Sequence, residues 1–230
     1  MIPSLLVAIL AFTCVASAQT VENRVSGTVN VRDSKGVRSG AGNAVVWLTA
    51  HDEQPDAKAA LPGTFRLTQK NKRFEPHLLV IPINSTVDFP NADHFFHNVF
   101  SVYEGTRFDL GLYESGSTKR VRFSRPGPSY IFCNIHPEMS AVVMVLESPY
   151  YAVTAANGQY SIEGVPDGEY TLQVWFERAR PEQLKELSRK ITVSGNMVAP
   201  ALNIDEAPSP SEGHTNKYGQ EYEKPPDPKY

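Results

Sequence analysis

Short runs of alternating apolar and polar residues, separated by turn-forming residues, account for most of this sequence. Clear examples are "RVSGTVNV" from Arg24, "HLLVIPI" from His77 and "EYTLQVWF" from Glu169, and turn formers such as "DSKG", "RPGPS" and "PDGE" lie between such runs. A period of two places successive side chains on opposite faces of a strand, so each run buries one of its faces. Many short strands at close spacing predict an all-β protein, built as a sandwich or a barrel. Only "RPEQLKELSRK" predicts a helix, of about two turns, with Pro181 at its first position.

Both ends of the chain are predicted to lie outside this fold. The apolar run from Leu5 to Val15 is followed by small residues ending at Ala18, a pattern that predicts a signal peptide over residues 1–18. Cleavage there predicts export, periplasmic or secreted, with no transmembrane segment left; an uncleaved anchor is the alternative. From position 205 the sequence is rich in proline, charge and small polar residues, which predicts a disordered or loosely draped tail over residues 205–230.

Charge and cysteine usage narrow the functional classes. The net charge of −3 is too small to favour nucleic acid or an anionic membrane as a partner. Of the two cysteines, Cys14 lies in the predicted signal peptide, so Cys133 would remain alone after export. A lone thiol in an oxidising compartment is buried and inert, paired with another chain, or bound to a metal.

Of these three possibilities, the residues around Cys133 favour a thiol that is bound to a metal. In "YIFCNIHPEM", Cys133, His136 and Met139 follow one another at three-residue steps. A thiolate, an imidazole and a thioether belong to the ligand set of a mononuclear copper electron-transfer site, which needs a second histidine in addition.

Another strand must supply that second histidine. The candidates in the neighbouring strands are His77, His94 and His97. His97 opens the alternating run "HNVFSV", where a side chain at a strand end can point toward a neighbouring loop. It precedes Cys133 by 36 residues (133 − 97), which leaves room for an intervening hairpin.

Residues from about Thr64 to Leu146 resemble the cupredoxin family, most closely plastocyanin and amicyanin. The resemblance is carried by "RFEPHLLVIPINSTVDFPN", "HNV" at His97 and "RPGPSYIFCNIHPEM". It implies a Greek-key β-sandwich that binds one copper ion, cycling between Cu(I) and Cu(II). The implied equatorial ligands are His97, Cys133 and His136, and the implied axial ligand is Met139. His94 is expected not to bind the ion.

The sequence departs from the family pattern at two places. Asn84 stands where the family prefers glycine, and asparagine tolerates the left-handed conformation that a turn there requires. Ser140 stands where glycine is expected soon after the methionine, a change that removes no ligand.

A second resemblance covers the remaining strands. The stretch "YAVTAANGQYSIEGVPDGEYTLQVWF" is similar to the carboxypeptidase-regulatory-like, or transthyretin-like, β-sandwich, and the opening strands of that family match "VSGTVNVRDSKGVRSGAGNAVVWL". We therefore expect a cupredoxin domain at 64–147 to be inserted into a second small sandwich formed by 24–50 together with 150–204. Trp47 and Trp175 are expected in the core of this outer sandwich.

The function implied is that of a periplasmic blue copper protein, which carries single electrons between redox partners such as a c-type cytochrome or a dehydrogenase. Two alternatives remain open: a periplasmic copper carrier or buffer, and a non-redox binding module of the cell envelope. An enzyme is not expected, because the sequence has no G-x-S-x-G, no HExxH and no second histidine cluster.

Overall fold

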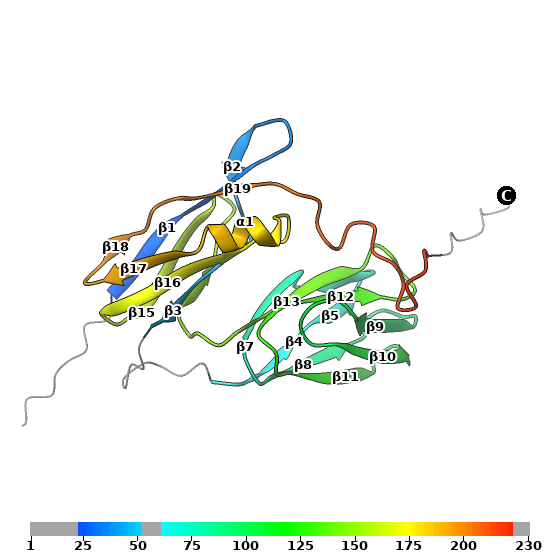
Figure 1. Ribbon diagram of the computed structural model, residues 1–230. Coiled ribbons are helices and arrows are strands. Elements are labelled where there is room, and N and C mark those ends of the chain that lie inside the picture. The colour runs from blue at the N-terminus through cyan, green and yellow to red at the C-terminus, as the bar shows by residue number, and fades with distance from the viewer. Residues whose placement is uncertain (1–22, 52–60, 223–230) are drawn as a thin grey trace, which may run out of the picture.

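The computed structural model describes residues 23–51 and 61–222, which form two β-sandwiches side by side (Figure 1). Strands dominate, and one short helix, α1 (Pro181–Glu186), begins with a proline in its first turn. The all-β prediction is therefore confirmed, and the predicted helix is present with about the expected length, six residues that begin at Pro181. The predicted signal peptide lies outside the described residues. In the part of the chain that the structure describes, no helix is long and apolar enough to cross a membrane.

The outer sandwich combines strands from the two ends of the chain. One sheet has the order β15 (Gln159–Val165), β1 (Asn23–Arg32), β18 (Met197–Val198), and β1 also pairs with β2 (Arg38–Gly40) and β19 (Leu202–Asp205). The other has the order β14 (Tyr151–Val153), β3 (Val45–Ala50), β16 (Gly168–Trp175), β17 (Arg189–Val193). Its core contains Val25, Val29, Val46, Leu48, Ile162, Tyr170, Leu172 and Ile204.

The inner sandwich contains the strands between β3 and β14. Its larger sheet has the order β10 (Phe108–Tyr113), β9 (His97–Ser101), β12 (Gly127–Cys133), β13 (Ser140–Leu146), β7 (Leu78–Pro82). Its smaller sheet has the order β11 (Thr118–Phe123), β8 (Ser85–Pro90), β4 (Thr64–Arg66), and a hairpin joins β5 (Thr68–Lys70) to β6 (Arg73–Glu75). Between the sheets pack Ile81, Val87, Phe89, Val99, Phe123, Ile131 and Val143.

Strand pairing shows how the two sandwiches are connected. β3 pairs with β14 and β16, for example Trp47 with Tyr151 and Val46 with Val174, whereas β4 pairs with β8 of the inner sandwich. On these pairings we propose that residues 64–147 are an insertion in a sandwich formed by 24–50 and 150–204. Asn84, in the turn between β7 and β8, has a φ of 66°. This is the left-handed conformation that glycine adopts readily and that asparagine tolerates.

The prediction for the two tryptophans is wrong. Val46 and Leu48 of β3 point into the core of the outer sandwich, so Val45 and Trp47 point out of its other face. Trp175 likewise leaves that core and packs in a cluster with side chains of the inner sandwich, among them Phe100, Tyr130, Phe132 and Met144. Because this sheet is covered on both faces, alternation alone did not show which face met which partner.

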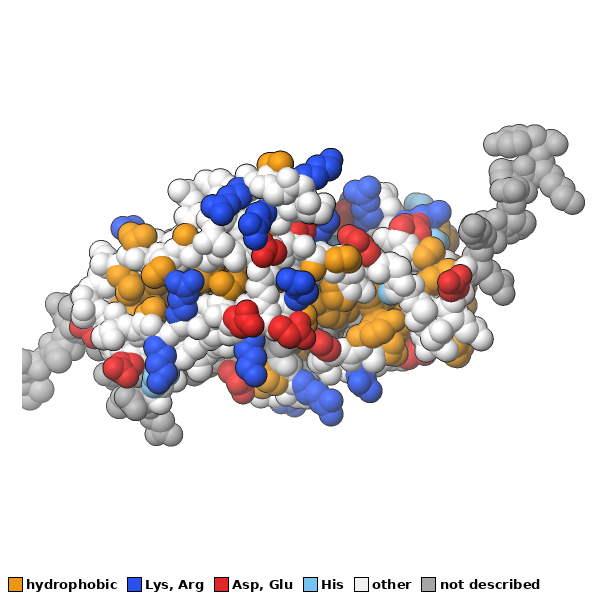
Figure 2. Space-filling model, turned by 45° about the horizontal axis from the view of Figure 1, so that its top comes forward, with side chains coloured by type: hydrophobic (Ala, Val, Ile, Leu, Met, Phe, Trp, Pro, Cys, Tyr) orange, Lys and Arg blue, Asp and Glu red, His pale blue; other side chains and the backbone are white. Residues whose placement is uncertain are grey.

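A groove of about 940 Å³ runs beside this junction, with both tryptophans among its lining. Tyr130 and Met144 line it from the inner sandwich, and Leu184 lines it from α1. Figure 2 shows hydrophobic side chains exposed near the middle of the molecule, where the two sandwiches meet.

Residues 205–222, for which a disordered or loosely draped tail was predicted, follow a defined path from the outer sandwich across to the inner one (Figure 1). The hydroxyls of Ser209 and Ser211 donate to Glu177 Oε1 at 2.8 and 2.7 Å. Lys217 Nζ meets Asp109 Oδ2 at 2.8 Å. Polar side chains thus hold a segment that has little apolar surface to bury. Residues 223–230 lie outside the described part of the chain.

Glu177 also joins the sandwiches directly. Its Oε2 lies 2.6 Å from His77 Nε2, and His77 Nδ1 lies 3.1 Å from the carbonyl oxygen of Ser140. The hydrogen bond that the His77 Nε2–H donates to Glu177 is the largest influence on the imidazole, and it raises the pKa of His77 above the ordinary 6.5 against the opposing effect of burial. Burial alone would raise the pKa of Glu177, but the hydrogen bonds from His77 and Ser211 lower it.

This pair predicts a pH-dependent stability. A raised His77 pKa contributes stability that is present in full below pH 6.5 and is lost as the pH rises through the pKa of the folded protein. We therefore expect the difference in thermal unfolding temperature between the native chain and His77→Gln to shrink as the pH is raised from 6 toward 9. His94→Gln, which changes an exposed histidine of the same sandwich, should show no such trend. An equal difference across this range would contradict the assignment.

Candidate metal centre

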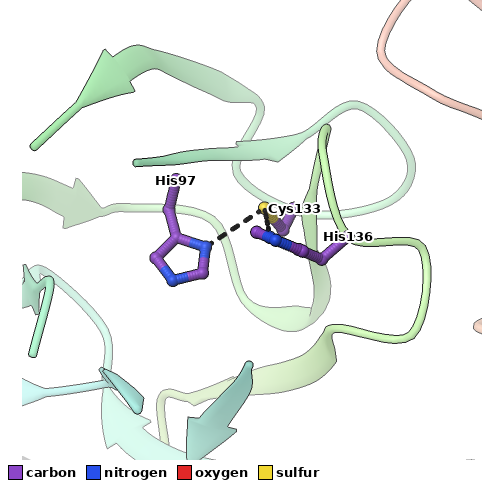
Figure 3. Close-up of side chains that lie close together, drawn as sticks. All are labelled: His97, Cys133 and His136. Atoms are coloured by element: carbon purple, nitrogen blue, oxygen red, sulfur yellow. Dashed lines mark hydrogen bonds between the residues drawn. The ribbon is translucent and has the colours of Figure 1, made fainter. Parts of the chain in front are cut away.

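Three of the four predicted ligand residues meet at one end of the inner sandwich (Figure 3). Cys133 Sγ lies 3.5 Å from His97 Nδ1 and 3.6 Å from His136 Nδ1. Donors about 2.0–2.3 Å from a shared ion, typical of imidazole and thiolate, are separated by about 3.5 Å when they subtend roughly 110–120°. The two nitrogens and the sulfur are therefore close enough to bind a single ion, and they are the donor types of a blue copper site.

Two neighbouring strands and one tight loop create this arrangement. His97 opens β9 and Cys133 closes β12, and the two strands pair with Cys133 opposite Val99. The loop that follows returns on itself, because the Met139 N–H donates to the His136 carbonyl at 3.0 Å and the Cys133 N–H to the Met139 carbonyl at 3.3 Å. The loop thus holds His136 beside the thiol at the end of the sheet.

Met139 is fully buried in the same core cluster as Cys133. Its backbone closes the ligand loop, and its side chain lies among apolar neighbours rather than in solvent. A thioether in such surroundings is a weak, soft donor, which suits the axial position that the resemblance gives it.

Asp93 fixes the orientation of His97. Its Oδ2 accepts the His97 Nε2–H at 2.9 Å, so Nδ1 is left with a free lone pair facing Cys133. Metal-binding histidines commonly donate their other ring N–H to a carboxylate, which fixes the tautomer and the ring orientation.

A hairpin in turn holds Asp93. The backbone N–H groups of Asn71 and Lys72 donate to Asp93 Oδ1 and Oδ2 at 2.6 and 3.1 Å. Both residues have a φ of 54°, the paired left-handed conformation of a two-residue type I′ turn between β5 and β6. Burial would raise the pKa of Asp93, but the hydrogen bonds from His97, Lys72 and Asn71 lower it below its ordinary value. The carboxylate is therefore charged and triply hydrogen-bonded.

Sequence reasoning missed the role of Asp93. The signal was its position four residues before His97, but this spacing has no fixed meaning in a loop, and its other two donors lie 22 and 21 residues away. Only the folded hairpin shows that both carboxylate oxygens of Asp93 accept hydrogen bonds, from three donors in all.

The local electrostatics differ at the thiol and at the loop histidine. Burial raises the pKa of Cys133, opposed by backbone N–H groups of Asn98, Ile135 and His136 that approach its sulfur. Burial also lowers the pKa of His136, and the nearby His97 lowers it further. A neutral His136 keeps a lone pair for metal binding, whereas burial favours the protonated form of the Cys133 thiol when no cation is bound.

The other histidines take no part in this cluster. His94 is exposed, and His77 faces Glu177 and Ser140. Within the described residues, the group of close metal-binding side chains contains His97, Cys133 and His136, without His94.

Comparison with known proteins gives partial similarities. No protein-family model and no curated protein matches the chain significantly. Among solved structures, the copper-containing nitrite reductase of Thermus scotoductus is 30% identical over 38% of this chain and 23% of its own, with a TM-score of 0.34. The purple cupredoxin of Nitrosopumilus maritimus is 22% identical over 35% of this chain and 98% of its own, with a TM-score of 0.32.

A mutant amicyanin in its Cu(I) form is also similar, at 22% identity over 44% of this chain and 99% of its own, with a TM-score of 0.35. Each of these neighbours resembles less than half of the chain. The grouping of His97, Cys133 and His136 rests on the side-chain geometry, not on these similarities.

Proposed function

We propose that this protein is a type 1 copper protein that carries single electrons. The observation that carries the proposal is the convergence of one ligand atom each from His97, Cys133 and His136 within 4.8 Å of one another, with Met139 buried in the same core cluster as Cys133. One bound copper ion would supply one-electron chemistry between Cu(I) and Cu(II).

The protein's own contribution is rigidity. Asp93 fixes His97, the sheet fixes Cys133, and the backbone hydrogen bonds of the loop fix His136. A donor set held in one geometry changes little between the two oxidation states, which favours electron transfer over catalysis at an open coordination position. For this reason we propose an electron carrier and not an enzyme.

The surface around His136 supports docking of a redox partner. Phe95 packs beside the His136 ring at a centroid distance of 5.4 Å and is 38% exposed. Phe96 and Ile135 are 52% and 44% exposed. An apolar patch beside a half-buried ligand suits a transient complex with a protein such as a c-type cytochrome or a dehydrogenase, in the periplasm or another exported location.

Copper loading tests the proposal. The Cu(II)-loaded chain should show an intense visible thiolate absorption and a type 1 EPR signal, and a redox titration should be reversible with one electron per protein. In competition, a Cu(I) chelator should remove the metal slowly. Rapid loss of copper to the chelator would favour the alternative of a copper carrier or copper buffer. Absence of the visible band would contradict a type 1 site.

A further inference from the structure

The C-terminal segment contacts the residue that carries the thiolate. The Tyr222 hydroxyl donates to the main-chain oxygen of Cys133 at 3.0 Å. One residue further along the loop, the Lys217 N–H donates to Asn134 Oδ1 at 3.0 Å. Together with Ser209 and Ser211 on Glu177, these contacts tie both ends of the segment 209–222 to the folded body.

The same segment reaches the strand that carries His97. Lys217 Nζ meets Asp109 Oδ2 at 2.8 Å, and Asp109 Oδ1 accepts the side-chain amide of Asn98 at 2.8 Å. The main-chain oxygen of Asn98 accepts the Asn134 N–H, also at 2.8 Å. The peptide between Cys133 and Asn134 is therefore held at its carbonyl by Tyr222 and at its N–H by Asn98.

His214 packs the segment onto Phe132, the residue before Cys133. The two rings stack with centroids 4.0 Å apart and an angle of 22°. His214 Nδ1 lies 2.9 Å from the Ser211 carbonyl oxygen, so that nitrogen carries the proton, and the neutral Nε2 accepts. Nε2 lies 3.1 Å from the Tyr222 hydroxyl, whose single proton is therefore shared between His214 and the Cys133 carbonyl.

The peptide that Tyr222 holds determines where the following amides point. The backbone N–H groups of Ile135 and His136, which lower the pKa of Cys133 against the effect of burial, follow directly from the Cys133–Asn134 peptide. If this peptide turns, these N–H groups turn with it. Hydrogen bonds to the cysteine sulfur tune the potential of a blue copper site.

We propose that residues 209–222 form part of the metal centre, with Tyr222 as a positioning residue that holds the Cys133–Asn134 peptide and, through it, the direction of the amides that follow Cys133. This inference rests on the proposed function. Tyr222 touches no metal-binding atom, and it acts on metal retention and on potential through the main chain of Cys133.

The test is Tyr222→Phe in the full-length chain, loaded with copper. It keeps the ring and removes the donor to the Cys133 carbonyl. We expect Cu(I) affinity, measured by chelator competition, to fall roughly 10-fold, the lower end of the effect of losing an outer-shell partner. The reduction potential should fall as well, because weaker N–H donation to the sulfur destabilises the more electron-rich Cu(I) form.

The matched control is Tyr218→Phe. Tyr218 belongs to the same segment and is 71% exposed, so loss of its hydroxyl should leave affinity, potential and spectrum at their native values. A second variant, His214→Phe, keeps an aromatic ring on Phe132 and removes the competing acceptor. Its affinity should remain close to that of the native chain, because Tyr222 can then donate fully to Cys133.

Three results would overturn the inference. In the first, Tyr222→Phe retains native affinity and potential, whether or not the apoprotein loses thermal stability. In the second, Tyr218→Phe changes both quantities as much as Tyr222→Phe. In the third, His214→Phe loses as much affinity as Tyr222→Phe, so that packing and not the hydroxyl is responsible. Failure of the proposed function is distinct, since the native chain itself would then lack the thiolate band.

Discussion

Cys133→Ser should abolish the intense visible absorption of the Cu(II)-loaded protein. Cys133 is fully buried, with its sulfur 3.5 Å from His97 and 3.6 Å from His136, and both nitrogens face it. A serine hydroxyl is close in shape, but it stays protonated near neutral pH and cannot supply a thiolate. We expect the loss of copper affinity to exceed the roughly 100-fold upper range seen for outer-shell partners.

The measurement is a visible spectrum at matched protein and copper concentrations, together with metal analysis after dialysis. Met139→Leu is the matched control in the same loop, since it removes only the thioether that we propose as a weak axial donor. That variant should keep both copper and colour, with a higher potential. Full colour in Cys133→Ser would refute the type 1 assignment, and with it the electron-transfer proposal.

Asp93→Asn should weaken copper binding by roughly 10- to 100-fold, the range typical of outer-shell partners of metal-binding histidines. Three N–H groups, those of Asn71, Lys72 and His97, point at the two carboxylate oxygens. An asparagine offers one oxygen and one NH₂ group, so at least one of these donors would face another donor. His97 would lose its fixed tautomer or the hairpin would lose its anchor, and each change costs a buried hydrogen bond.

Chelator competition with copper would measure this effect, and thermal unfolding of the apoprotein would show how much of it is lost stability. His94→Ala is the control, because it changes an exposed side chain next to Asp93 that lies outside the ligand cluster. The role given to Asp93 is wrong if the affinity of Asp93→Asn equals that of His94→Ala.

The sequence by itself determined the features that depend on local pattern. Period-two alternation determined the strands, because one residue sets the face of the next. The three-residue steps from Cys133 to Met139 determined which side chains share one loop, and the resemblance added His97. Asn84 was expected to tolerate a left-handed turn where the family prefers glycine, and its φ of 66° lies in that region.

Only the tertiary structure decided which distant groups meet. The alternating pattern placed Trp47 on one face of its strand. Whether that face packs in the core of its own sandwich or against the neighbouring sandwich depended on how the two sandwiches pack together. The composition of the C-terminal segment predicted little burial, yet polar contacts fix it, and Tyr222 reaches Cys133 from 89 residues away. Asp93 likewise depends on amides presented by a separate hairpin. Such partners lie far apart along the chain and carry no local period, so their pairing is set by packing rather than by pattern.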